Sequence, residues 1–141
     1  MQTGNLDCAV SEITWHGAVP FGLRASCIRA MFCLLERLFS KATLETSVEM
    51  WWDSPAYDWA CGNRSRANGG EGEPMQDVMF ETLSRVLELG SPHCQGAAQH
   101  GLGDLQHPGT EALIQSYLDH DDSMEPALRE YARAAARFDV L

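Results

Sequence analysis

Apolar residues recur every three or four positions along two stretches of the chain, which predicts two amphipathic helices. The first covers residues 22–39, with charged residues such as Arg29 and Arg37 opposite its apolar set. The second covers 75–89, and Gly90 suits the left-handed position that ends a helix. The apolar sets are Leu23, Cys27, Ile28, Met31, Leu34, Leu35 and Leu38, then Met75, Met79, Leu83, Val86 and Leu87.

Another helix is predicted between these two, with Thr43 as its cap, running to about Trp52 before Pro55 stops it. Three short helices follow near 92–106, 109–119 and 124–138. Ser91 and Pro92 supply a cap and a first-turn proline for the first of them. No run of alternating polarity is long enough for a strand. The predicted fold class is therefore all-α, with about six helices.

Two segments lack helical periodicity. Residues 1–20 contain glycines and Pro20, and we expect an extended or looped arm anchored by Trp15. Residues 62–74 hold four glycines and almost nothing apolar, so burial offsets little of the ordering entropy and a flexible loop is predicted. About sixty residues on either side of that loop are few for separate domains, so we predict a single helical domain over 1–141.

The C-terminal third repeats itself at an offset of 34 residues, a spacing that suits stacked helix pairs. Cys94 corresponds to Leu128, Ala97 to Tyr131, Ala98 to Ala132 and Gly101 to Ala135. Alanine and glycine at such positions let a neighbouring helix approach closely. Residues 91–141 resemble the HEAT-type repeats of the bilin-lyase class through Ala97-Ala98, Leu102-Gly103, Leu105, Pro108, Leu113, Leu118-Asp119, Asp121, Leu128-Arg129, Ala132 and Ala135.

The resemblance implies a short α-α superhelix that binds other proteins. It covers about a third of the chain. The sequence departs from the pattern at His93-Cys94, and Gly96 and Gly101 weaken a helix. Deoxyhypusine hydroxylase resembles this architecture and holds iron through His-Glu pairs. No His-Glu dipeptide occurs here, and Gln95 and Gly96 stand at the corresponding place, so that activity is not carried over.

The formal net charge of −10 opposes binding to nucleic acid or to an anionic membrane, because such binding relies on lysine and arginine. A protein partner or self-association is compatible with it. Five cysteines, at positions 8, 27, 33, 61 and 94, form no CxxC pair, and no signal peptide is apparent. These features are typical of reduced thiols in a cytoplasmic protein.

No motif predicts a catalytic residue, a metal or a cofactor. His93, His100 and His107 recur every seven residues, but neighbours so spaced on one helix are about 10.5 Å apart along the axis, too far for one tetrahedral ion. We expect capping, turn and packing roles, while a site that recruits His16 or His120 stays open. Residues 119–130 imitate a calcium-binding loop but have Met124 where glycine is needed.

An aromatic run is the strongest candidate for a binding surface. Tryptophan and tyrosine supply large apolar area with polar groups, the composition favoured at interaction hot spots. Core packing under the glycine-rich loop is the alternative. The run consists of Trp51, Trp52, Tyr57 and Trp59.

Together these patterns predict a protein-protein interaction module, of a regulatory or immunity type, that is not an enzyme. The alternative is a small-ligand-binding or enzymatic helical domain. Its pocket would be lined by the aromatic run and by polar groups such as His93 and Asp104.

Overall fold

The computed structural model describes residues 6–41 and 52–140. Within these ranges the chain is helical and has no strand, which confirms the all-α prediction. The α-helices are α1 (Leu6–Trp15), α2 (Phe21–Arg37), α4 (Asp53–Ala60), α5 (Gly72–Leu87), α6 (Pro92–Leu105), α7 (Thr110–His120) and α8 (Pro126–Ala136), and the 3-10 helices are η1 (Phe39–Lys41) and η2 (Arg66–Asn68).

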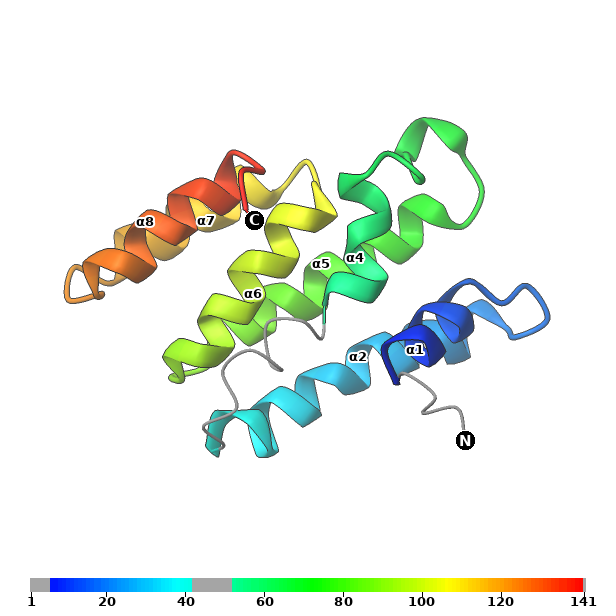
Figure 1. Ribbon diagram of the computed structural model, residues 1–141, viewed down its shortest axis with the longest axis horizontal. Helices are drawn as coiled ribbons and strands as arrows, with labels where there is room; N and C mark the ends of the chain where they lie inside the picture. The colour runs from blue at the N-terminus through cyan, green and yellow to red at the C-terminus, as the bar shows by residue number, and fades with distance from the viewer. Residues whose placement is uncertain (1–5, 42–51, 141) are drawn as a thin grey trace.

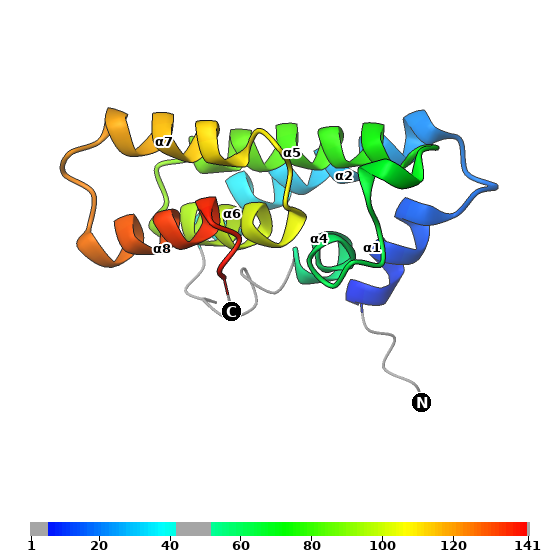
Figure 2. The ribbon, with the colours of Figure 1, turned by 90° about the horizontal axis from the view of Figure 1, so that it is seen from above.

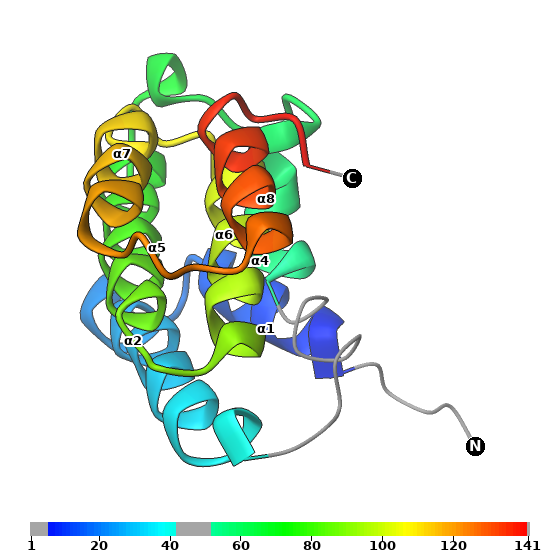
Figure 3. The same ribbon diagram turned by 90° about the vertical axis from the view of Figure 1, so that its left-hand side faces the viewer.

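The helices form two layers (Figures 1 and 2). One layer contains α2, α5 and α7, and the other contains α1, α4, α6 and α8, as the view along the molecule shows most directly (Figure 3). The helix α6 lies between α4 and α8 in its layer and packs against α5 of the other layer. Within the described ranges, no helix is long and apolar enough to cross a membrane.

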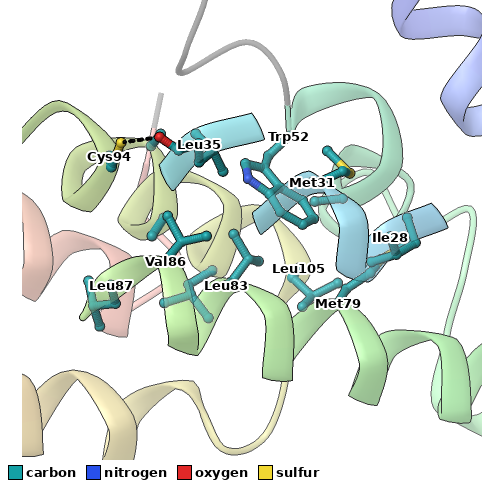
Figure 4. Packing of buried hydrophobic residues seen from close by; sticks show 14 of the residues in the cluster. Ile28, Met31, Leu35, Trp52, Met79, Leu83, Val86, Leu87, Cys94 and Leu105 are labelled. Atoms are coloured by element: carbon teal, nitrogen blue, oxygen red, sulfur yellow. Dashed lines mark hydrogen bonds between the residues drawn. The ribbon is translucent and has the colours of Figure 1, made fainter. Parts of the chain in front are cut away.

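The core lies between the layers, and the stripe predicted for residues 75–89 forms its middle. Met75, Met79 and Leu83 of α5 are fully buried. Trp52 lies beside Leu35 and Met31 of α2 and above Leu83 (Figure 4). Because one large indole fills the junction of α2, α5 and α6, the two layers are held together by shape-specific packing.

Small residues on α6 permit the close approach that the sequence predicts. A methyl group added at Gly101 would lie 2.9 Å from Leu83 Cδ2 and 3.1 Å from Trp52 Cβ. Ala97 and Ala98 are completely buried. The glycine that departs from the repeat pattern therefore has a packing reason, which offsets its low helix propensity.

Two of the four position pairs of the predicted 34-residue repeat are alike in burial, whereas buried Cys94 and Ala97 correspond to half-buried Leu128 and Tyr131. Ala98 and its counterpart Ala132 are both completely buried, and so is Ala135, the counterpart of buried Gly101. These residues belong to α6 and α8, which pack against each other. The repeat thus coincides with two adjacent helices of one layer.

The helix α2 has the predicted limits but not the predicted buried face. Its buried side is Arg24, Ala25, Ile28, Met31 and Leu35. Leu23, Leu34 and Leu38, which the sequence analysis assigned to the inner stripe, are 65%, 40% and 56% exposed. The assignment is wrong for these leucines because the apolar arc of α2 is wider than the area that α5 covers.

The predicted extended arm is also wrong for residues 6–15, which form α1. Trp15, at the end of α1, is half-buried, and the Arg64 guanidinium lies 3.3 Å from its ring centre. Arg24 fixes the start of α2, since its Nε donates to Val19 O at 2.8 Å and its Nη1 to Thr14 O at 3.0 Å. Arg24 is almost wholly buried and also pairs with Glu71.

Other helix boundaries need correction. Pro55 does not end a helix but lies in the first turn of α4, where a missing N–H removes no helical hydrogen bond. Gly90 is not left-handed. The helix predicted from Thr43 lies largely outside the described residues. Part of the predicted loop 62–74 is regular, because it contains η2 and the first residues of α5.

Candidate functional site

The aromatic run is divided by the fold. Trp52 and Trp59 are buried in the core, which is the packing role considered as the alternative, whereas Tyr57 is 58% exposed. Trp51 lies outside the described residues. A buried indole offers no surface to a partner, so Tyr57 is the described member that is open to contact.

The three evenly spaced histidines of α6 and its flanks have separate environments. His107 is a turn and packing residue: its ring stacks on Phe80 at 4.0 Å, and its Nδ1 accepts from the Gly109 N–H at 2.9 Å. His93 is exposed in the first turn of α6. His100, in the middle of α6, meets groups from two other helices. The separation that the sequence predicts therefore holds: His100 lies among polar groups of α4 and α8, whereas His107 Nε2 lies 2.9 Å from Asp77 Oδ1 of α5, in the other layer.

That cluster comprises Asp53, His100, Asp104 and Tyr131, from α4, α6 and α8. His100 Nε2 lies 2.6 Å from Asp53 Oδ1 and 3.4 Å from Asp104 Oδ2, and its Nδ1 lies 2.7 Å from the Tyr131 hydroxyl. One ligand atom each from His100, Asp53 and Asp104 falls within 4.8 Å of the others. The arrangement can share a proton between the imidazole and the carboxylates, or hold a cation.

Burial distinguishes the two carboxylates. The Asp104 side chain is 10% exposed and the Asp53 side chain 42%. Loss of water raises the pKa of Asp104, while His100 lowers that pKa and Asp53 raises it. The Asp104 charge is therefore incompletely compensated inside the fold, and the cluster opens to solvent at Asp53.

Two further predictions concern groups outside this cluster. The Cys94 thiol is buried and donates to Leu35 O at 3.5 Å, and burial raises its pKa, so it is a packing group and not an activated nucleophile. At the corner before α8, Asp121 Oδ1 accepts from the Ser123 N–H at 2.9 Å. This carboxylate completes a local turn and does not cap α8, whose N-cap residue is Glu125 without a side-chain hydrogen bond.

A second feature is an apolar groove between α1 and α2, with a volume of about 440 Å³. The exposed leucines Leu34 and Leu38 form part of its wall. Arg37 is the charged residue that lines it. The walls are Val10, Cys27, Ala30, Met31, Cys33, Leu34, Arg37 and Leu38.

The sequence analysis missed both features, although each left a signal. The spacing of His100 and Asp104 is one helical turn, but Asp53 and Tyr131 are 47 and 31 residues from His100 in the chain. The groove was hidden because Leu34 and Leu38 were assigned to the same inner stripe as the core residue Leu35.

No family model matches the chain, and no curated protein or solved structure is similar to it.

Proposed function

We propose that this protein is a helical-repeat scaffold that binds a partner protein through the groove between α1 and α2. Val10 of α1 and residues of α2 such as Leu34 line this groove. The observation that carries the proposal is the second apolar stripe of α2. Leu23, Cys27, Ala30, Leu34 and Leu38 follow one another at helical spacing on a face next to that of the core residues Ile28 and Leu35.

An exposed stripe of this kind favours an interaction role. Three of its leucines are among the exposed large apolar side chains of the described chain, together with Ile13 of the adjoining α1. Contiguous apolar patches on soluble proteins commonly mark binding sites. The lining follows α2 from Cys27 to Leu38, which suits a third helix laid along it.

Charge favours an acidic amphipathic helix as the occupant. Residues 21–41 carry four cations and one anion, whereas the whole chain has twenty acidic and ten basic residues. Arg37 lines the groove, and Lys41 is exposed just beyond it. A symmetric pair of copies would place this basic segment against itself, so a second copy of the chain is the less favoured occupant.

The two-layer stacking, and the burial of Ala98 on α6 and of Ala132 and Ala135 on α8, support the HEAT-like repeat as the scaffold. The surface thiols of Cys33 and Cys61 favour a reducing compartment, so we propose the cytoplasm as the location. The acidic charge of the chain supports the view that nucleic acid is not the partner.

The test is titration of the protein with a labelled synthetic helix that has leucines at i, i+3, i+4 and i+7 and glutamates elsewhere, followed by fluorescence anisotropy. We expect saturable binding that salt weakens. Leu34→Glu should weaken it about 10-fold or more, which corresponds to a loss of about 1.4 kcal/mol. Tyr57→Glu is the matched control, because Tyr57 is also an exposed large apolar side chain but lies on α4.

Equal loss in both variants, or equal binding of a peptide with the same composition and scrambled spacing, would contradict the groove. Light scattering distinguishes the two candidate occupants of the groove, an acidic helix and a second copy of this chain. A dimer that Leu34→Glu dissociates would replace the acidic helix by a second copy of this chain.

A further inference from the structure

We propose that Asp53, His100 and Asp104 form a binding site for a divalent transition-metal ion, with zinc as the reference ion. The inference is independent of the groove, because the site lies on the outer part of the α4, α6 and α8 layer and shares no residue with the α1–α2 surface.

The ligand geometry suits a small ion. In a tetrahedral zinc site, two ligand atoms that each lie about 2.1 Å from the ion are about 3.4 Å from each other. His100 Nε2 and Asp104 Oδ2 are 3.4 Å apart already, and both belong to α6, one helical turn from each other. Asp53 Oδ1, at 2.6 Å from Nε2, would have to withdraw slightly. It can do so because its side chain is partly exposed.

Asp104 is the independent observation that points to a cation. Its carboxylate is nine-tenths buried, and its ion pair within the described residues is with His100 at 3.4 Å. When His100 carries its proton on Nε2, that proton points to Asp53, which is the nearer carboxylate. Asp104 then has no close hydrogen bond from His100. Buried carboxylates are stable when they are paired or coordinate a metal. An ion placed between Nε2 and both carboxylates would compensate both charges at once.

Tyr131 provides the support that metal-binding histidines usually have. An imidazole that coordinates through Nε2 carries its proton on Nδ1 and donates it to an acceptor that fixes the ring. The Tyr131 hydroxyl stands 2.7 Å from Nδ1, in position to accept. Tyr131 comes from α8, so the site would join three neighbouring helices of one layer.

The donor set selects the class of ion. One imidazole nitrogen with two carboxylate oxygens suits zinc, manganese or iron(II) better than the soft ions that prefer thiolates. Three protein ligands leave a coordination position for water, and the exposed side of Asp53 gives a path of entry.

The experiment uses untagged full-length protein freed of metal by a chelator and titrated with cobalt(II), with zinc then added to displace it. We expect one equivalent of cobalt with weak visible bands and no near-ultraviolet thiolate band. Asp104→Asn should abolish this binding while the protein stays folded by circular dichroism. Tyr131→Phe should weaken it about 10-fold, as removal of an orienting partner does.

The matched control is Asp77→Asn, which removes the carboxylate 2.9 Å from another histidine, His107. Binding should be unchanged in that variant. A thiolate band, failure to bind cobalt and zinc at millimolar concentration, or equal affinity in the Asp104→Asn variant would overturn the proposal. In that case the cluster is a hydrogen-bonded network that holds α4, α6 and α8 together.

Discussion

The helices α6 and α2 are both rich in apolar residues but differ in how completely they are covered. α6 has neighbours in α4, α5, α8 and η1, and nine of its fourteen residues are buried. α2 is covered by α5 and partly by α1, and five of its seventeen residues are buried. Most buried positions of α6 are small, whereas α2 leaves three leucines exposed.

The difference shows that side-chain size and burial are set by separate causes. Glycine and alanine occur on α6 because several helices approach it closely, and a larger side chain at these positions would clash with them. Leucine on α2 is not limited in this way, because one side of that helix has no described neighbour over much of its length. The central helix α6 is thus specified by close packing, whereas α2 retains exposed apolar area.

The largest expected effect comes from a cavity in the covered helix. Leu102→Ala should lower the free energy of unfolding by about 2–5 kcal/mol, because Leu102 is completely buried. Leu38→Ala on α2 should change it by no more than about 0.5 kcal/mol. Urea denaturation of both variants measures this contrast. Comparable losses would mean that α2 is covered in solution.

The next effect is overpacking. Ala98→Leu should cost about 1–3 kcal/mol, because Ala98 is fully buried on α6 and has no room for added methylenes. Ala30→Leu, at an exposed position of α2, should alter stability by less than about 0.5 kcal/mol. Thermal unfolding can compare the two. A tolerated leucine at position 98 would show that α6 and its neighbours are less tightly packed than described.

The smallest effect concerns a charge in the covered helix. Burial raises the pKa of Asp104, so the folded protein keeps this proton at a pH where the unfolded chain has lost it. The free energy of unfolding therefore falls as pH rises from the ordinary value of 3.8 to the raised folded value, and the loss persists at neutral pH. Asp104→Asn should be the more stable protein at neutral pH without metal.

Denaturation of the metal-free Asp104→Asn variant and of the wild type between about pH 4 and pH 7 tests this sign. The exposed carboxylate of α2 provides the control, since Glu36→Gln should follow the wild-type curve. A variant less stable than the wild type at neutral pH would show that the ion pair with His100 outweighs the desolvation of Asp104.

Periodicity predicted α2 and α5, because each of these helices has buried residues that recur at helical spacing. The start of α6 was readable from its cap, and Ser91 accepts from the Cys94 N–H as expected, whereas the left-handed end predicted at Gly90 was wrong. The short helix α1 was missed because glycine and proline interrupt the sequence around it. The proline at 55 was misread because its effect depends on whether it falls in the first turn of a helix or inside it.

The candidate sites could be predicted only in part, since they depend on which helices become neighbours. His100 and Asp104 are visible as a one-turn pair, but nothing local indicates that Asp53 and Tyr131 meet them. The exposed stripe of α2 was visible as apolar residues, but which of two adjacent faces the core takes is decided by α5. Which residues form a site is decided by the packing of helices that are distant in the sequence, and the local spacing of residues does not indicate that packing.

The burial of Trp52 and Trp59 makes the protein its own optical sensor. Both indoles lie in apolar surroundings, and the indole N–H of each is buried without a hydrogen-bond partner among the described residues. Their intrinsic emission should lie at short wavelength and shift to the red when water reaches the interior. Loosening of the contacts that α4 makes with α6 and α1 can therefore be followed at low concentration without an attached dye.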